Sequence, residues 1–197
     1  MKTIMKKIIL LALISGAFAI STNAQTSFSL QYSMGFGGTI NNYITSTSWR
    51  GVTLEYKFYP QPNISVGIDA SWNHFYERRA FDTYTNGTAS YSGVQFRYAE
   101  AIPIYLTTTY YLSPGEKINP FIGVGIGTMY LDRYTDMGIF RVSNDSWHFA
   151  MKPEVGVRVN LSPDMDFTVA LRYNNAFKTE DDNNQNYMTF NVGFVWK

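Results

Sequence analysis

The stretch that decides the fold is PFIGVGIGTMYL, residues 120–131. Side chains of an extended chain alternate between two faces, so this stretch has one apolar face and one face made largely of glycine. The apolar face carries Ile122, Val124, Ile126 and Tyr130, and the opposite face carries Gly123, Gly125 and Gly127. A row of glycines on one face of a strand indicates that other groups approach closely from that side.

The same alternation recurs along the chain and predicts eight β-strands. They are expected at residues 28–36, 52–58, 64–72, 96–110, 122–130, 147–161, 167–173 and 188–196. Each pairs an apolar face with a polar or glycine-containing face, which is the pattern of a half-buried strand.

The connections between these strands alternate in length. Three are short and marked by proline, at residues 60–63, 113–117 and 162–165, and four are longer and polar, at residues 39–48, 77–93, 133–145 and 178–186. Short turns at one end and long loops at the other are typical of an up-and-down antiparallel sheet. With an even number of strands, such a sheet closes into a barrel without exposed edges.

The glycines indicate that the polar face points into the barrel. Eight of them lie on that face: Gly35, Gly37, Gly67, Gly123, Gly125, Gly127, Gly156 and Gly193. An eight-stranded barrel is just wide enough to be filled by side chains, so small residues inside it make room for large ones. Aromatic residues at both ends of the apolar face, with aliphatic residues between them, favour a membrane barrel over a soluble lipocalin-like barrel.

The first 24 residues have the order of an export signal. Lys2, Lys6 and Lys7 precede an apolar run over residues 8–20, and Thr22 and Ala24 supply the small residues before a cleavage site. The run is too short for a transmembrane helix, which needs about 20 residues. We therefore expect a signal peptide at residues 1–24 and a barrel domain at residues 25–197, the alternative being a buried N-terminal helix.

Composition bounds the class of protein. The 197 residues are 17% aromatic and 16% charged, which suits one domain with a sizeable core. Without the three lysines of the expected signal peptide, the formal net charge falls from +1 to −2, so no basic surplus suggests a nucleic-acid partner. The absence of cysteine excludes disulfides and a lipid-modified N-terminal cysteine.

The chain resembles the small outer-membrane β-barrel proteins of Gram-negative bacteria, the OmpX/Ail-like and OmpA-transmembrane-domain-like group. The likeness covers residues 25–197 and rests on the repeated strands, on IPIYLTTTYYL followed by PFIGVGIG, and on the C-terminal NVGFVW. It implies an outer-membrane location, with outer-membrane lipid and lipopolysaccharide as neighbours. It also implies that Asn191, Gly193 and Trp196 belong to a signal read by the outer-membrane assembly machinery, and the NAQ at the cleavage site is similar to that of Bacteroidetes-type proteins.

The inward face collects charges of both signs. They are Glu55, Lys57, Asp69, Arg97, Lys152, Glu154, Arg158 and Arg172, with His148 beside them. Because unpaired buried charges are very costly, these groups are expected to pair across the lumen. We favour a structural ion-pair plug, and the alternative is a gated conduit or proton path.

The long connections carry aromatic residues among small polar ones. The candidates are Tyr43, Phe81, Tyr84, Tyr91, Tyr134 and Phe140. Aromatic rings beside adaptable polar side chains are typical of binding surfaces, so they suggest contact with an extracellular ligand or host surface. The alternative is an inert surface shielded by lipopolysaccharide.

The sequence offers little for catalysis, metals or cofactors. His74 and His148 are the only histidines, neither lies in a His-x-Ser arrangement, and the acidic run at residues 180–182 reads as solvated. We therefore expect no enzyme, cofactor or metal site. A structural or surface-interaction protein ranks first, an OmpW-like passage for small hydrophobic molecules second, and a lipid-modifying barrel enzyme third.

Overall fold

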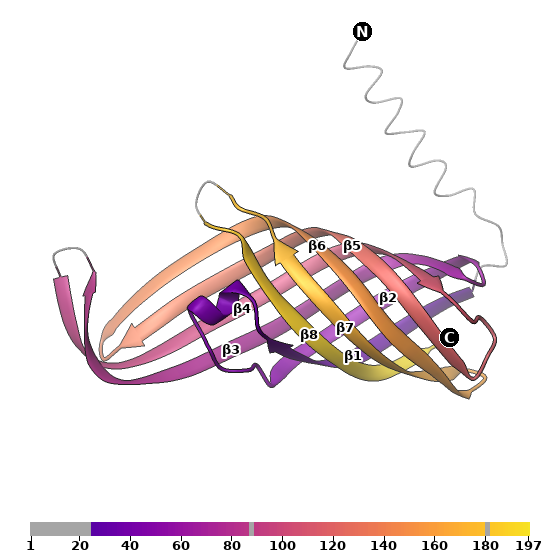
Figure 1. Ribbon diagram of the computed structural model, residues 1–197, viewed down its shortest axis with the longest axis horizontal. Coiled ribbons are helices and arrows are strands. Elements are labelled where there is room, and N and C mark those ends of the chain that lie inside the picture. The colour runs from indigo at the N-terminus through magenta and orange to yellow at the C-terminus, as the bar shows by residue number, and fades with distance from the viewer. Residues whose placement is uncertain (1–24, 87–88, 180–181) are drawn as a thin grey trace, which may run out of the picture.

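A computed structural model describes residues 25–86, 89–179 and 182–197, and the predicted signal peptide lies outside them (Figure 1). The strands are β1 (Gln25–Phe36), β2 (Arg50–Gln61), β3 (Ile64–Asn86), β4 (Ala89–Tyr111), β5 (Ile118–Met137), β6 (Phe140–Ser162), β7 (Met165–Ala176) and β8 (Gln185–Trp196). One short 3-10 helix, η1 (Thr39–Asn42), lies between β1 and β2.

The eight strands form a closed antiparallel barrel in chain order, which confirms the predicted fold class. Strand β1 pairs with β2 on one side and with β8 on the other, so that Leu30 lies opposite both Leu54 and Phe194. The closure leaves the membrane-spanning part of the sheet without an edge.

Among the described residues, no helix combines the length and the hydropathy needed to cross a membrane.

The two faces of the strands are oriented as the alternation predicts. The apolar face is exposed on the outside, as for Leu106, Ile122 and Val124, while polar residues such as Gln31 and Thr109 are buried inside. An outside that is apolar and an inside that is polar suit a barrel surrounded by lipid.

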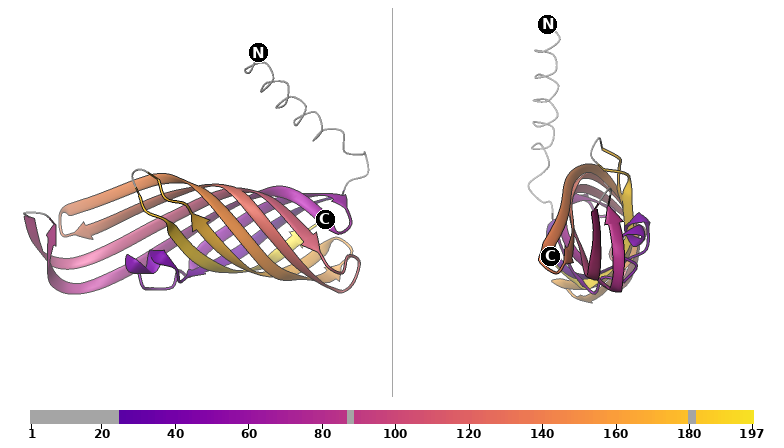
Figure 2. Two further views of the ribbon diagram at one scale, coloured as in Figure 1. Left: turned by 45° about the horizontal axis from the view of Figure 1, so that its top comes forward. Right: turned by 90° about the vertical axis from the view of Figure 1, so that its left-hand side faces the viewer.

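The strands differ in length, and this makes the barrel asymmetric. Strands β3 to β6 have 20 to 23 residues, whereas β1, β2, β7 and β8 have 12 each. Pairing of β2 with β3 ends at Arg50 and His74, and pairing of β6 with β7 ends at Ala150 and Ala176. Beyond these pairs β3 to β6 continue as a four-stranded sheet, called here the projecting sheet (Figures 1 and 2).

The prediction of long loops is therefore wrong for two of the four connections. Residues 77–93 and 133–145 largely continue the strands, with pairs such as Glu77 with Arg97 and Arg133 with Asn144. Their threonine, serine and tyrosine residues read as a polar connection, yet these residue types are also compatible with strands. The pairing of these strands provides hydrogen-bond partners for the backbone N–H and C=O groups of the two segments outside the membrane.

The end of the barrel from which the projecting sheet extends is called here the upper end. The connection between β1 and β2 folds against this part of the barrel instead of extending into solvent. Ile40 and Ile44 are fully buried there, in a cluster with Phe75, Met129 and Leu131. Part of the upper lumen is thus filled by apolar side chains, whereas the sequence suggested small and polar residues throughout. Above the membrane, the side chains of the strands still alternate between the inside and the outside of the barrel. There the inward-facing side chains can pack against apolar side chains of a loop, as in the core of a soluble protein.

The orientation of the barrel can be tested with single cysteines, because the chain has none of its own. Short turns of such barrels face the periplasm. On intact cells, a membrane-impermeant maleimide should label Ser92→Cys, in the projecting sheet, and spare Glu116→Cys, in a short turn. Labelling of Glu116→Cys alone would reverse the orientation.

Candidate functional site

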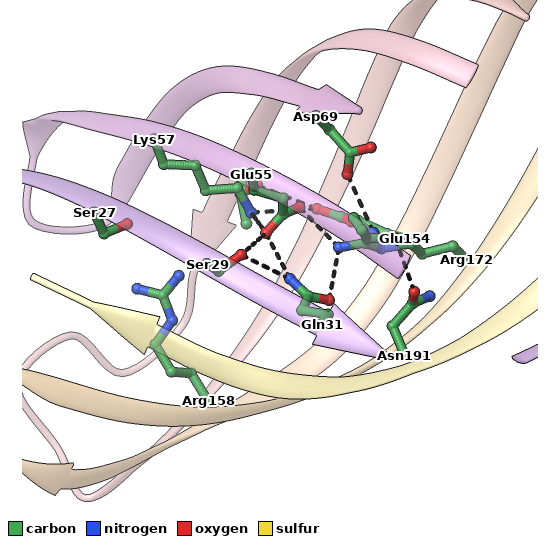
Figure 3. A network of polar contacts seen from close by, with 12 residues as sticks. Ser27, Ser29, Gln31, Glu55, Lys57, Asp69, Glu154, Arg158, Arg172 and Asn191 are labelled. Carbon is green, nitrogen blue, oxygen red and sulfur yellow. Dashed lines mark hydrogen bonds and ion pairs between the residues drawn. The ribbon is translucent and has the colours of Figure 1, made fainter. Parts of the chain in front are cut away.

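A network of charged side chains fills the middle of the lumen. It has three carboxylates and three cations, all almost completely buried: Glu55, Asp69, Glu154, Lys57, Lys152 and Arg172. They come from β2, β3, β6 and β7, whose inward positions meet at one height of the barrel (Figure 3). The formal charges of these six groups sum to zero.

Arg172 lies at the centre of the network and contacts all three carboxylates. Its Nη2 lies 2.7 Å from Glu55 Oε1, its Nη1 lies 3.1 Å from Asp69 Oδ2, and its Nε lies 3.1 Å from Glu154 Oε2. The planar guanidinium suits this role because it presents donors in several directions at once.

The two lysines complete the pairing. Lys152 Nζ lies 2.6 Å from Asp69 Oδ2 and 3.2 Å from Glu154 Oε2. Lys57 Nζ lies 3.4 Å from Glu55 Oε2 and 3.7 Å from Glu154 Oε1. Each carboxylate therefore has at least two cationic neighbours, which offsets the cost of burying it.

Neutral side chains also donate hydrogen bonds to these carboxylates. Glu55 Oε2 accepts hydrogen bonds from Gln31 Nε2 at 2.9 Å and from Ser29 Oγ at 3.1 Å. Glu154 Oε1 accepts one from Thr109 Oγ1 at 3.3 Å. The arrangement is a layer of ion pairs across the lumen, in which Glu154 Oε2, Arg172 Nε and Arg172 Nη1 have ionic neighbours but no hydrogen bond among the described residues.

The glycines of β5 make room for these side chains. A Cβ atom added at Gly123 would lie 2.7 Å from Glu154 Oε1, and one at Gly125 would lie 3.1 Å from Tyr105 Cβ and 3.3 Å from Lys152 Cε. The close approach that the glycine row predicted thus comes from lumen side chains. Gly127 is confined by backbone, because its added Cβ would lie 2.0 Å from Ile104 O.

We expect Gly125→Val to lower the free energy of unfolding by about 1–3 kcal/mol, because the added methyl groups overpack the lumen against Tyr105 and Lys152. Urea unfolding in lipid vesicles measures the change. Gly93→Val is the matched control, since nothing lies within 4 Å of a Cβ added there. Equal stability of the two variants would contradict the role assigned to Gly125.

Two of the predicted lumen charges lie outside the network. Arg97 lies on the long part of β4, higher than the others, where its Nη1 donates to Tyr43 O at 3.1 Å and its guanidinium stacks on the Tyr43 ring. Arg158 lies below the network, beside Tyr59 and Tyr111. Alternation predicts which face of a strand carries a residue but not the position of that residue along the barrel axis. The prediction therefore grouped Arg97 and Arg158 with the other inward-facing charges.

The predicted loop aromatics take different positions. Phe81 and Phe140 are 71% and 54% exposed on the projecting sheet. Tyr134 lies on β5, stacked on Tyr98 with ring centroids 4.6 Å apart. Tyr84 and Tyr91 are paired between β3 and β4, and their side chains lie outside the described part.

Tyr43 is half-buried instead of exposed. Its hydroxyl lies 2.6 Å from Thr135 Oγ1, and the guanidinium groups of Arg97 and Arg133 lie 5.2 Å and 5.9 Å from the centre of its ring. Burial raises the pKa of this phenol above its ordinary value. The residue anchors the β1–β2 connection to the barrel.

A polar cluster lies at the upper end of the lumen. The sequence placed His148 on the inward face but did not predict its partners. His148 Nε2 lies 2.8 Å from Ser146 Oγ, His148 Nδ1 lies 2.9 Å from Phe177 O, and Arg133 Nη2 donates to Asp182 Oδ2 at 2.6 Å. Asp182 also lies 3.3 Å from Ser146 Oγ. Asp182 belongs to the acidic run 180–182 that was predicted to be solvated, and this prediction is wrong for Asp182, whose side chain is 7% exposed.

The residues of the predicted assembly signal lie on β8. Asn191 is buried in the lumen near Thr53, while Trp196 faces outward and stacks on Phe28 with ring centroids 6.1 Å apart. Gly193 is held against β1, where an added Cβ would lie 2.2 Å from Leu30 O. Within the described residues, no group of three His, Cys, Asp or Glu could hold a metal ion.

Eight antiparallel strands with an apolar outside and a charged, filled inside define a transmembrane β-barrel protein. Residues 9–197 match the family described as outer membrane protein beta-barrel domain, and the chain belongs to that family. It is an outer-membrane protein. No curated protein sequence matches the chain.

Solved structures with the same fold have very different sequences. Neisserial surface protein A is 12% identical, with a TM-score of 0.59 over 89% of this chain and 99% of its own. OprG from Pseudomonas aeruginosa is 12% identical, with a TM-score of 0.57 over 87% and 94%. Ail, the attachment invasion locus protein of Yersinia pestis, is 9% identical, with a TM-score of 0.52 over 88% and 96%.

Proposed function

We propose that the protein is a structural barrel whose projecting sheet contacts a ligand or surface outside the cell. The observation that carries this proposal is the projecting sheet itself. Four strands continue well beyond the closed part of the barrel, although a barrel of this size can cross the membrane with strands of 9–11 residues. The extra length serves the extracellular side.

The tip of the projecting sheet presents apolar side chains to solvent. Ile139 is 95% exposed, and Phe81, Phe140 and Val142 are more than half exposed. A shallow pocket of about 450 Å³ lies between the two hairpins, lined mainly by apolar residues that include Phe81 and Phe140. Exposed apolar patches on soluble parts of proteins commonly mark interaction sites. The attachment role in the name of Ail supports the same reading.

The proposal is tested by adhesion of cells that display the protein. The double variant Phe81→Ser, Phe140→Ser should reduce adhesion to immobilised extracellular-matrix proteins or epithelial cells several-fold. Trp49→Ser is the control, because Trp49 is 65% exposed but lies outside the projecting sheet. Equal adhesion of both variants and of cells without the protein would contradict the proposal.

A passage for small hydrophobic molecules is the second candidate, and one observation favours it. Part of the upper lumen is apolar, where Ile40 and Ile44 pack in one cluster with Phe75, and this part would suit a hydrophobic solute. The charged network directly below opposes passage along the axis. Large single-channel currents in planar bilayers, reduced by small hydrophobic compounds, would support this candidate.

A lipid-modifying enzyme has the weakest support. Ser146 and His148 are hydrogen-bonded, but both are buried in the lumen and not on the face that meets lipid. An acyl-transfer site needs access for its substrate, and these side chains offer none on the lipid side.

A further inference from the structure

The projecting sheet has open edges, unlike the closed barrel below it. Among the described residues, pairing of β6 with β7 ends at Ala150 and Ala176, and one further backbone bond joins Phe177 N to Phe149 O at 2.8 Å. The first part of β6, residues 140–148, therefore forms one edge of the projecting sheet (Figure 1). A sheet edge in water presents backbone N–H and C=O groups with which another strand can pair.

The backbone of this β6 edge points away from the sheet at every second residue. The C=O of Phe149 points to the side of β7, whereas that of His148 accepts a hydrogen bond from Thr128 Oγ1 of β5 at 3.0 Å. The register between β5 and β6 is unbroken along the edge, so the same alternation holds throughout. Three residues of the edge share the direction of Phe149, away from β5: Arg141, Ser143 and Asp145.

The side chains leave the β6 edge accessible. Residues 140–145 are all exposed. The Arg141 side chain is held over β5, because its Nε donates to Asp136 Oδ1 at 2.6 Å and its guanidinium lies over the Tyr134 ring. Val142 is 52% exposed and lies on the inner side of the sheet, the side on which Ser146 is buried. An added strand would therefore meet an apolar side chain on its inner face and polar side chains on its outer face.

The opposite edge of the projecting sheet, on β3, is protected. A β-bulge interrupts its pairing with β4 between Arg79 and Asp82. Lower down, the β1–β2 connection lies against this edge, where Thr45 N donates to Glu77 Oε2 at 2.6 Å. Bulges, charged side chains and covering loops are the usual means by which proteins block sheet edges. The β6 edge has an unbroken register instead.

We propose that the β6 edge binds an extended peptide segment of an extracellular protein, which adds one strand to the projecting sheet. Backbone hydrogen bonds to Arg141, Ser143 and Asp145 supply affinity, and alternate side chains of the segment supply specificity. The segment that fits has an apolar residue opposite Val142 and polar residues on its other face. This inference rests on the proposed function, because it names the kind of partner that the projecting sheet contacts.

Amide hydrogen exchange, followed by NMR of ¹⁵N-labelled protein in lipid nanodiscs, tests whether the edge is open. The amides of Arg141, Ser143 and Asp145 should exchange about tenfold faster, or more, than those of Val142 and Asn144, which point to β5. Equally slow exchange of all five amides in the free protein would overturn the proposal.

The binding probe is a synthetic peptide of alternating valine and threonine with a lysine at each end. When its valines lie on the side of Val142, the N–H groups of its threonines face β6. The peptide should slow exchange of the Arg141, Ser143 and Asp145 amides about tenfold. The same peptide with N-methyl groups on its threonines should not, because it lacks the donors.

Two variants separate the backbone of the edge from its side chains. Ser143→Pro removes an N–H that points away from β5, and proline is tolerated on edge strands. It should weaken binding of the peptide about tenfold, whereas Ser143→Ala keeps the N–H and should bind within about twofold of the unmodified protein. If Ser143→Pro fails to fold, the N-methylated peptide decides the question with the unmodified protein.

Equal binding by the two Ser143 variants, equal binding of the N-methylated peptide, or no saturable binding of the unmodified peptide would overturn the proposal. The adhesion assay described above separates this failure from that of the proposed function. Adhesion that is lost in Phe81→Ser, Phe140→Ser but retained in Ser143→Pro would reject the β6 edge and leave the proposed function standing.

Discussion

Replacing Arg172 by methionine is expected to lower the free energy of unfolding by about 3–5 kcal/mol. Methionine preserves much of the length of the side chain but removes the charge that contacts Glu55, Asp69 and Glu154. Three buried carboxylates would then face two lysines. Urea unfolding of the protein reconstituted in vesicles measures the loss.

Two further variants separate charge pairing from general damage. Arg78→Met, at an exposed position of the projecting sheet, should leave the stability within about 0.5 kcal/mol of the unmodified protein. The double variant Arg172→Met, Glu154→Gln removes one charge of each sign, so it should recover part of the loss. A double variant as unstable as the sum of its single variants would show that the groups do not act as one network.

The second large effect concerns the lipid face. Val124→Arg, near the middle of the apolar band, should cost about 2–4 kcal/mol, because a charge would face the hydrocarbon core of the membrane. Val124 lies on β5, between Thr108 of β4 and Pro153 of β6, with its side chain exposed on the outside of the barrel.

Ile139→Arg is the control for this substitution. Ile139 is also apolar and almost fully exposed, but it lies in the turn between β5 and β6 at the tip of the projecting sheet. The same chemical change should alter stability little there, because water and not lipid surrounds the tip. A similar loss at both positions would mean that Val124 does not face lipid.

The fold was predictable because its signal is local. Alternation in stretches such as residues 120–131 assigns each residue to a face, and the glycines then show which face is inside. Gly123 illustrates the point, since the side chain of Glu154 occupies the space that a larger residue would fill. The period-two alternation and the sizes of the side chains were sufficient to predict the number of strands, the closure of the barrel and the face that lines the lumen.

Height along the barrel was not predictable in the same way. Arg97 and Arg172 share the inward face, but only Arg172 lies at the level of the carboxylates, because the register between strands decides height. The burial of Ile40 and Ile44 depends on how a polar connection folds back, and contact between Asp182 and Arg133 joins segments far apart in the chain. Such contacts depend on tertiary structure and cannot be predicted from the periodicity of the sequence.

Because the strands differ in length, the protein presents a different height above the membrane to neighbours on its different sides. On the side of β4 and β5 the barrel wall stands high above the lipid, whereas on the side of β1 and β8 its rim is low (Figure 2). A large extracellular molecule can reach the concave inner side of the wall only over the low rim. A molecule that sat beside the low rim would therefore obstruct access to that side, even without touching any of the residues that line it.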